Sequence, residues 1–162
     1  MKVIAMNRVE PKLVKALVDL ETEAFGAGGM NEWHLVPLIR HGKVFVLLEG
    51  EDPIGAAQYM LDWEQPRTSY MVGVSIASGQ RGKGLGKELL SETFRQLGQK
   101  GIEKVELTVS PDNLAAVTLY ERYFGFKRVD YRIAEYGERE DRLVLELDVL
   151  QWLEEDKKKH KL

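Results

Sequence analysis

The spacing of hydrophobic residues divides the N-terminal part of the chain into one strand and two helices. Residues 2–8 alternate loosely between apolar and polar, which predicts a first strand. After Pro11, apolar residues recur at helical spacing until a glycine-rich break at residues 26–29, which predicts a first helix. Asn31 is a suitable N-cap for a second helix, which Pro37 should shorten or kink.

Three successive strands are predicted in the middle of the chain. Residues 44–48 are continuously apolar, as in a strand that is covered on both faces. Residues 54–61 follow after a turn and should pair back as a hairpin. A polar loop over residues 62–67 then leads into a third strand over residues 68–76.

The second half of the chain alternates between helical and strand periodicity. A stripe of apolar residues predicts a helix that ends at a pair of glycines (Leu85, Leu89, Leu90, Phe94 and Leu97, then Gly98 and Gly101). In the next strand, residues 104–109, apolar and polar side chains alternate, so one face should be buried and the other should line a site. The polar face of that strand carries Glu106, Thr108 and Ser110.

A helix, a hairpin and a short terminal helix are predicted at the C-terminal end of the chain. Residues 113–123 predict a helix, and residues 126–134 with residues 142–147 predict a final hairpin joined by a charged linker. Residues 150–162 could add a short helix, with residues 157–162 expected to be a frayed, solvated end.

This order of elements, β-α-α-β-β-β-α-β-α-β-β, predicts an α/β (α+β) fold. Hairpins imply antiparallel pairing, whereas the two strands that flank the helix from Leu85 should run parallel. We therefore expect a mixed, mostly antiparallel seven-stranded sheet with helices on both faces. The length suits a single domain over residues 1–150, followed by a short charged tail over residues 151–162.

Composition narrows the class of protein. Hydrophobic residues make up 44% and charged residues 30%, and the formal net charge of −3 does not favour a nucleic-acid partner. The absence of cysteine excludes disulfides and thiolate catalysis. We find no apolar run long enough to span a membrane, no signal segment and no metal-ligand spacing, so we expect a cytoplasmic protein with no metal and no membrane partner.

The stretch with the clearest chemistry is the glycine-rich turn between the third strand and its helix, from Arg81 to Lys87. The first amides of a helix lack internal partners and carry partial positive charge, and glycines let backbone N–H groups approach a ligand. With Arg81, Lys83 and Lys87, the turn is typical of a phosphate or pyrophosphate site. Its spacing fits neither the P-loop nor the dinucleotide pattern, because the required lysine and third glycine are absent.

The same turn resembles the acyl-CoA pyrophosphate loop of the GNAT superfamily of N-acetyltransferases. The family pattern of Arg or Gln, two residues, Gly, one residue and Gly or Ala is met by Arg81, Gly84 and Gly86. The chain also resembles a second motif of the family, in which an Asn and a Tyr are seven residues apart and a Gly-Phe pair follows. Here these residues are Asn113, Tyr120 and the pair Gly125–Phe126. The C-terminal half is also similar to ribosomal-protein N-terminal acetyltransferases.

The resemblance implies the GNAT fold and acetyl-CoA as co-substrate. It implies that the backbone of the third middle strand binds the pantetheine arm, that the turn binds the pyrophosphate and that the second motif contacts the arm from the other side. The residues carried over are, in that order, Val74, Ser75 and Ile76; Arg81, Gly82, Lys83, Gly84, Leu85, Gly86 and Lys87; and Asn113 with Tyr120.

The resemblance also implies that Tyr120 is the general acid that protonates the departing thiolate. Four residues separate Tyr120 from Gly125, whereas the family usually has three, so the helix end must absorb one extra residue and Tyr123 is a rival. The general base is open. Thr108 stands where the ribosomal-protein enzymes carry a glutamate, and Glu106 on the same face, or a water, would replace it.

The expected reaction is acetyl transfer from acetyl-CoA to a primary amine by direct attack in a ternary complex. The acceptor could be a small molecule or the amine of a peptide or protein. Acidic residues near the expected acceptor loops would attract a cationic amine (Glu21, Glu23, Glu32, Asp62, Glu64, Glu135, Glu138, Glu140 and Asp141). The alternative is a non-catalytic acyl-CoA-binding sensor or regulatory module, and a homodimer is compatible with either function.

Overall fold

The computed structural model describes residues 1–161, and the chain forms two compact units. Unit 1 comprises residues 1–61 and 71–96, and unit 2 comprises residues 62–70 and 97–162, of which Leu162 lies outside the described residues. The expectation of one domain over residues 1–150 stays a prediction, and each unit is described by itself below.

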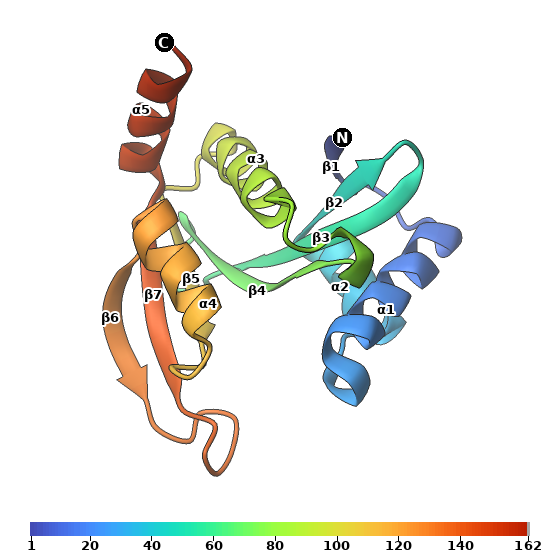
Figure 1. The fold of residues 1–162 in the computed structure, drawn as a ribbon, viewed down its shortest axis with the longest axis horizontal. Coiled ribbons are helices and arrows are strands. Elements are labelled where there is room, and N and C mark those ends of the chain that lie inside the picture. The colour runs from blue at the N-terminus through green and yellow to red at the C-terminus, as the bar shows by residue number, and fades with distance from the viewer. Residues whose placement is uncertain (162) are drawn as a thin grey trace. The chain divides into compact units, whose positions relative to one another are not determined.

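Unit 1 contains the N-terminal strands and helices (Figure 1). Its elements are β1 (Lys2–Ala5), α1 (Pro11–Phe25), the 3-10 turn η1 (Gly26–Gly28), α2 (Glu32–His41), β2 (Lys43–Glu49), β3 (Asp52–Leu61), most of β4 (Thr68–Ile76), the 3-10 turn η2 (Ser78–Gln80) and most of α3 (Leu85–Gln99). The strands β1, β2 and β3 pair antiparallel. The first strand ends at Ala5 and is therefore shorter than predicted. Met6 still donates a backbone hydrogen bond to the carbonyl oxygen of Val44 (2.9 Å), but the chain then turns toward Pro11.

The two N-terminal helices begin where the sequence predicts. Pro11 occupies the first turn of α1, where no backbone N–H is needed. At α2, the Asn31 side chain accepts a hydrogen bond from the Trp33 amide (3.0 Å), while His34 Nδ1 accepts one from the Asn31 amide (3.2 Å). Pro37 lies inside α2, which has ten residues, so the short helix expected from that proline is confirmed.

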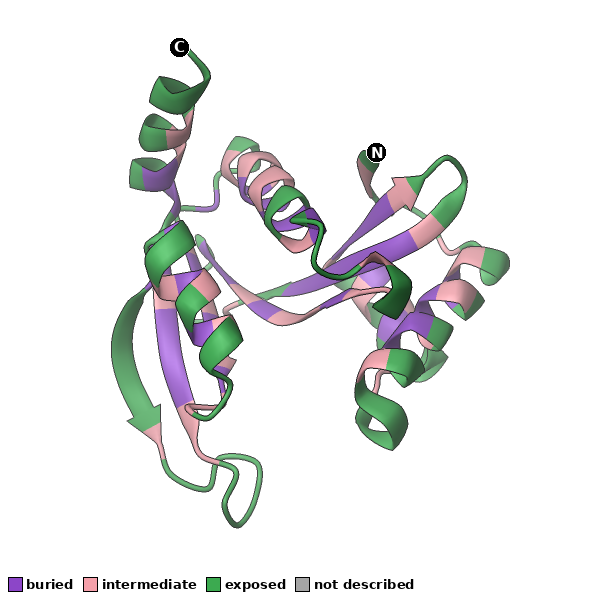
Figure 2. Cartoon of the chain, in the orientation of Figure 1, coloured by how far each residue is buried: buried purple, intermediate pink, exposed green. Residues whose placement is uncertain are grey.

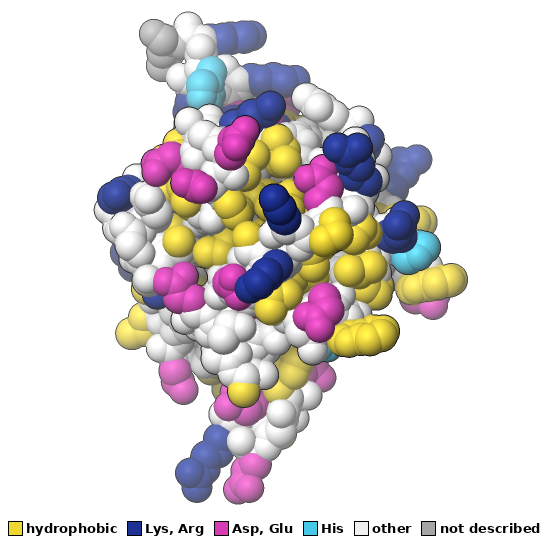
Figure 3. Space-filling model, turned by 90° about the vertical axis from the view of Figure 1, so that its right-hand side faces the viewer, with side chains coloured by type: hydrophobic (Ala, Val, Ile, Leu, Met, Phe, Trp, Pro, Cys, Tyr) yellow, Lys and Arg dark blue, Asp and Glu magenta, His cyan; other side chains and the backbone are white. Residues whose placement is uncertain are grey.

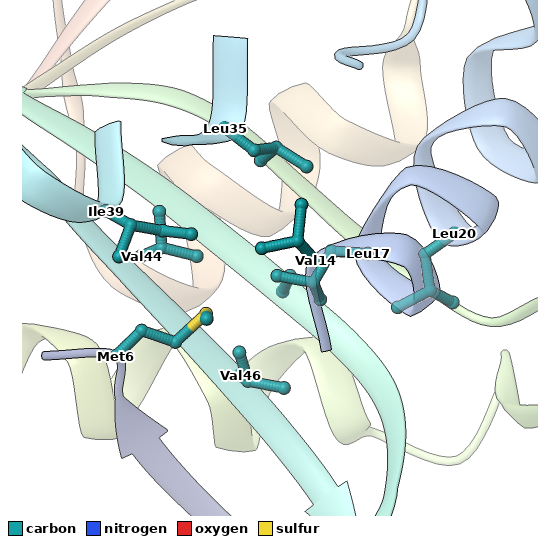
Figure 4. Packing of buried hydrophobic residues seen from close by; sticks show 9 residues of the cluster. Met6, Val14, Leu17, Leu20, Leu35, Ile39, Val44 and Val46 are labelled. Carbon is teal, nitrogen blue, oxygen red and sulfur yellow. The ribbon is translucent and has the colours of Figure 1, made fainter. Parts of the chain in front are cut away.

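A hydrophobic cluster holds α1 and α2 against β2 and β3 of unit 1 (Figure 4). The same apolar positions that set the helical periodicity supply it from the helix side. Its buried members are Met6, Val14, Leu17, Leu20, Leu35, Ile39, Val44, Val46 and Ala56. Burial of this kind contributes about 25 cal/mol per Å² of apolar surface, so the cluster is a main source of the stability of unit 1.

Unit 2 contains the start of β4, the end of α3 and the C-terminal elements. These are β5 (Lys104–Val109), α4 (Leu114–Thr118), a π-helical turn η3 (Leu119–Phe124), β6 (Lys127–Arg132), β7 (Arg142–Asp148) and α5 (Val149–His160). In this unit β4 pairs parallel with β5 through Thr68–Tyr70, and β7 pairs antiparallel with both β5 and β6. The predicted parallel pair is therefore confirmed.

The two faces of β5 differ as the alternation predicts. Val105, Leu107 and Val109 are buried, whereas Glu106 and Thr108 are half-buried on the opposite face. Its neighbour β7 is buried along most of its length, while β6 at the edge of the sheet is largely exposed (Figure 2). Unit 2 thus has one buried, apolar face and one partly exposed face that carries polar side chains. We call the second one the open face; it includes Glu106, Thr108, Arg142 and Glu146.

The seven strands follow the order β1-β2-β3-β4-β5-β7-β6, with antiparallel hairpins and the parallel β4–β5 pair. This is the mixed, mostly antiparallel sheet that the order of elements predicts. One C-terminal expectation is wrong: residues 157–160 are helical rather than frayed. The Asp148 side chain caps the start of α5 through the Gln151 amide (3.0 Å), and the helix continues to His160.

On the face drawn in Figure 3, lysine and arginine side chains are interspersed with aspartate and glutamate, so that face carries no extended basic surface. Among the helices of residues 1–161, none combines the length and the apolar composition needed to cross a bilayer.

Candidate active site

The glycine-rich turn of unit 1 has the backbone geometry that a phosphate loop requires. Gly82 and Gly84 have φ angles of +78° and +76°, a backbone conformation that residues with a Cβ atom rarely adopt. Gly84 accepts the first helical hydrogen bond, from the Glu88 amide (3.2 Å), so Leu85 and Gly86 lie in the first turn of α3, where a helix does not use the backbone N–H groups. A helix N-terminus of this kind favours an anion.

Two basic side chains of the turn are tethered to it. Arg81 donates from Nε to the carbonyl oxygen of Ile76 (3.0 Å) at the end of β4. Lys83 donates to the Gln80 side chain (3.1 Å). Both residues are exposed, so their cationic groups remain accessible to a ligand from solvent.

The strand that enters this turn carries an unsatisfied polar atom. The Ser75 hydroxyl is buried and has no hydrogen-bond partner among residues 1–161. A buried polar group without a partner costs free energy, which a ligand group could recover. The flanking residues Val74 and Ile76 are half-buried.

In unit 2, Tyr120 lies in the π-helical turn and is 6% exposed, with its ring 5.5 Å from that of Phe126. Burial raises the pKa of the Tyr120 phenol to about 12, and the positive charge of Arg142 opposes this shift in part. No residue in 1–161 forms a hydrogen bond with the Tyr120 hydroxyl. Tyr120 is therefore a neutral phenol with a hydroxyl available to a ligand.

The π-helical turn explains how the extra residue before Gly125 is accommodated. A π turn contains one more residue than an α turn, so the segment Leu119–Phe124 absorbs it within the helix. The turn closes at Gly125, which has the left-handed conformation (φ +83°). The Phe126 amide then donates a hydrogen bond to the backbone carbonyl oxygen of Tyr120 (2.9 Å). Tyr123, the rival acid, is 49% exposed, which is far from the desolvated setting of Tyr120.

Asn113 is the N-cap of α4 and is exposed. Its side-chain oxygen accepts a hydrogen bond from the Ala116 amide (3.2 Å). The cap uses the oxygen only, so the side-chain NH₂ group keeps its donors for a ligand.

Thr108, which the sequence resemblance aligns with a glutamate, contacts two neighbours on the open face of unit 2. Its hydroxyl lies 3.2 Å from the Tyr70 hydroxyl, and Arg142 donates from Nε to that hydroxyl (3.2 Å) and from Nη2 to the Thr108 carbonyl (3.1 Å). Burial raises the pKa of the Tyr70 phenol. This position therefore holds a polar network in place of a carboxylate.

Glu106, the candidate base, lies two residues earlier on the same half-buried face. Burial raises the pKa of its carboxyl, with the negative charges of Glu146 and Asp62 adding to the shift and Arg132 and Lys104 opposing it. A carboxyl with a raised pKa is a better proton acceptor at neutral pH than an exposed one.

The acidic residues expected to attract a cationic amine have diverse settings. Glu135 forms an ion pair with Arg132 (3.0 Å), and Asp141 accepts hydrogen bonds from the Tyr131 hydroxyl and the Ala134 amide, which lower its pKa. Glu23 accepts hydrogen bonds from the amide and hydroxyl of Ser78, and these lower its pKa.

Glu21 does not belong to an acidic surface, because it is only 2% exposed. It accepts hydrogen bonds from the Met30 amide (3.1 Å) and the Gln58 side chain (3.4 Å), and burial raises its pKa. The Gln58 side-chain oxygen is itself buried without a partner among residues 1–161. The helical spacing Val14–Leu17–Glu21 placed this carboxyl on the buried face of α1, a signal that its acidic character obscured.

Within residues 1–161 there is no group of three or more side chains suited to hold a metal ion. Two of the three histidines make local contacts: His34 in the cap of α2, and His160, whose Nδ1 lies 2.8 Å from the Asp156 carbonyl.

With this geometry in place, comparison with known proteins gives the family. Residues 12–126 match the model of the acetyltransferase (GNAT) family. The chain belongs to the GNAT acetyltransferase family. The resemblance seen in the two motifs is thereby confirmed, and acetyl-CoA is the acetyl donor used by this family.

Two curated relatives cover part of the chain. L-2,4-diaminobutyric acid acetyltransferase of Shouchella clausii is 27% identical over 89 residues, which are 55% of this chain and 50% of that protein. Mycothiol acetyltransferase of Streptomyces scabiei is 35% identical over 86 residues, which are 51% of this chain and 26% of that protein. The chain thus matches half or less of the length of these relatives.

The fold is also that of solved GNAT structures. The ribosomal-protein-S18-alanine N-acetyltransferase of Escherichia coli superposes with a TM-score of 0.75 at 20% identity, over 91% of this chain and 94% of that one. The GNAT fold expected from the sequence is confirmed.

Proposed function

We propose that this protein transfers the acetyl group of acetyl-CoA to a primary amine in a ternary complex. The observation that carries the proposal is the geometry of the turn Arg81–Lys87. Two glycines with positive φ and two tethered basic side chains lie there at the N-terminus of α3, which favours an anion. The family match covers this turn and the second motif.

The residues present fit acetyl-CoA. The turn would bind the pyrophosphate, and the buried, unpaired Ser75 hydroxyl and the backbone of Val74 and Ile76 offer polar groups to the pantetheine amides. The NH₂ group of Asn113 would donate to the same arm. Acetyl-CoA supplies an activated acyl group with a thiol as leaving group, and a backbone N–H of β4 near Val74 would polarise the thioester carbonyl.

Two proton movements fall to side chains. The amine nitrogen must lose a proton as its bond to the acyl carbon forms, and Glu106, with its raised pKa, would accept that proton directly or through water. The carbon–sulfur bond breaks, and the neutral phenol of Tyr120 would donate a proton to the departing sulfur. The net reaction moves one proton from nitrogen to sulfur, and passage of a proton from Glu106 to the Tyr120 phenolate through solvent would return both side chains to their starting states.

The relatives bear on the acceptor. Two curated relatives are named as acetyltransferases of diaminobutyric acid and of mycothiol, and the structural neighbour as an N-acetyltransferase of a ribosomal protein's alanine. Diaminobutyric acid and alanine both carry an amine, which supports an amine acceptor. The non-catalytic sensor gains no support from these comparisons. The homodimer and the cytoplasmic location stay predictions.

The direct test is release of CoA thiol from acetyl-CoA in the presence of an amine panel: lysine, 2,4-diaminobutyrate, spermidine, an aminoglycoside and short peptides. Because the chain has no cysteine, a thiol reagent detects only liberated CoA. We expect release that depends on one amine class and that yields one acetylated amine for each thiol. Binding of acetyl-CoA without release from any amine would favour the sensor instead.

A further inference from the structure

Charged side chains are distributed unevenly over the open face of unit 2. At one end, Lys104 lies 3.5 Å from the Glu146 carboxylate, so that the two charges neutralise each other. At the other end, Arg142 on β7 stands opposite Arg132 on β6 in the strand register. Two like charges directly opposite each other are destabilising unless each finds a partner.

Only one of these two arginines has carboxylate partners among residues 1–161. Arg132 pairs with Glu135 (3.0 Å) and Asp130 (3.8 Å). Arg142 forms no ion pair with any carboxylate in that part of the chain, although it is half-buried. A partly desolvated guanidinium without an anion is costly, and an external anion would offset that cost.

The guanidinium of Arg142 is held rigidly on one side only. Its Nε and one Nη2 proton point to Thr108, at 3.2 and 3.1 Å, and its Cζ lies 5.2 Å from the centre of the Tyr136 ring. A guanidinium has five N–H donors in a planar fork. Since Thr108 accepts two of them, the edge formed by Nη1 and the second Nη2 proton keeps the paired donors that match the two oxygens of a carboxylate.

Arg142 lies near residues to which the proposed reaction gives a role. The Tyr70 hydroxyl shares Thr108 with Arg142, and the charge of Arg142 reaches the Tyr120 phenol and lowers its pKa against the effect of burial. On the same face, Glu106 is a half-buried carboxyl that is affected by the charges of Glu146 and Asp62 and, in the opposite sense, by those of Arg132 and Lys104. One face of unit 2 therefore offers carboxylates suited to an ammonium group and a fixed guanidinium suited to an anion.

We propose that Arg142 binds a carboxylate carried by the acceptor amine, so that the acceptors of this enzyme are amino acids rather than polyamines or aminoglycosides. The proposal rests on the acetyltransferase function given above. The carboxylate takes the open edge of the guanidinium, with Tyr136 stacked on the guanidinium, and the amine of the same molecule is directed to Glu106. Arg142 is thus a specificity-determining residue.

The test uses pairs of amines that differ only in the carboxylate: lysine against cadaverine, and 2,4-diaminobutyrate against 1,3-diaminopropane. Charge-assisted, two-point binding of this kind discriminates by about 10- to 100-fold. We expect kcat/KM for CoA release to be higher by that factor with the amino acid of each pair, mainly through a lower KM. A ratio near one, or a preference for the diamine, in the unmodified enzyme overturns the proposal and leaves acetyl transfer itself intact.

Variants locate the effect. In Arg142→Gln the preference for the amino acid should fall to a ratio near one, and Arg142→Lys should retain part of it because the charge remains without the fork. Arg128→Gln is the matched control, since it removes a guanidinium that is already paired with Glu121 (2.8 Å), and it should keep the full preference. Full preference in a folded Arg142→Gln enzyme contradicts the assignment, and thiol release with no amine of the panel overturns this proposal together with the transferase function.

Discussion

The roles proposed for single side chains in this protein depend on their burial as well as on their residue type. Tyr120 and Tyr123 are three positions apart in one turn, yet one is 6% exposed and the other 49%. The spacing from Asn113 favoured Tyr120 as the acid, and the structure gives it the desolvated environment in which a neutral hydroxyl is held ready.

Removing the Tyr120 hydroxyl tests this role. We expect Tyr120→Phe to lower kcat by about 10²- to 10⁴-fold, the usual contribution of a general acid, while KM for acetyl-CoA changes little. Steady-state kinetics with Tyr123→Phe as the control would separate the two tyrosines. If Tyr123→Phe is the variant that loses turnover, the assignment to Tyr120 is wrong.

Glu21 gives a second prediction at this scale, in stability rather than turnover. Burial raises its pKa in the folded state above the unfolded value of about 4.3, so the folded protein holds this proton more tightly. The stability contributed by the protonated carboxyl is present in full below the unfolded pKa and is lost as pH rises through the folded pKa.

Because glutamine does not ionise, Glu21→Gln should gain stability relative to the wild type as pH rises over that window. Denaturant unfolding at a series of pH values measures the difference, with Glu51→Gln, on the exposed β2–β3 turn, as the matched loss of a surface carboxylate. A Glu21→Gln curve that runs parallel to this control would contradict the prediction.

At the scale of elements, hydrophobic periodicity predicted most of the secondary structure. The alternation in β5 and the apolar stripes of α1 and α3 gave both the element and its buried face, because side-chain burial follows directly from strand and helix geometry. Two features were out of reach of this pattern. The end of β1 depends on a turn toward Pro11, and α5 persists to His160 beyond a run of lysines that carries no apolar signal.

The glycine-rich turn provides the prediction at this scale. Gly84 has a φ of +76°, and no neighbouring atom lies within 4 Å of the position that a Cβ would take, so Gly84→Ala introduces backbone strain without a clash. The strain should lower the free energy of unfolding by about 1–2 kcal/mol and weaken acetyl-CoA binding. Gly79→Ala, in equally open space but without a positive φ, should change neither quantity appreciably.

Calorimetry and titration with acetyl-CoA would measure both effects. Equal behaviour of the Gly84 and Gly79 variants would show that the left-handed backbone of the turn is dispensable.

For the whole molecule, the order of elements correctly predicted a mixed seven-stranded sheet with one parallel pair, whereas the order of the strands across the sheet was not predicted. Local periodicity cannot specify which strands become neighbours, because that depends on pairings between segments far apart in the chain. The same holds for the candidate site. The glycine turn and Tyr120 were predicted from motifs, whereas the partners of Thr108 and the lack of a carboxylate partner for Arg142 among residues 1–161 could be found only in the three-dimensional structure.

Ligand binding should be visible in the stability of the whole protein. A ligand at 100 times its Kd stabilises the folded state by about 2.7 kcal/mol, which corresponds to a rise in Tm of roughly 5–10 °C for a chain of this size. We expect acetyl-CoA to produce such a rise in a thermal melt, and ATP and NAD at the same concentration to produce little. Equal shifts with all three ligands would mean that the protein recognises only the phosphates they share.

The π-helical turn at Leu119–Phe124 has a consequence for how related sequences are aligned. By the family pattern, which has three residues between the tyrosine and the Gly-Phe pair, other members are one residue shorter here. An alignment that keeps Tyr120 in the tyrosine column therefore opens its gap inside this turn, after Tyr120. If the gap is placed upstream, before Asn113, the register shifts by one residue. Glu121 then stands in the tyrosine column of the family, and the chain is read as lacking that tyrosine. Homologues that lack an apparent tyrosine at this column therefore merit realignment around the turn before they are classified as inactive.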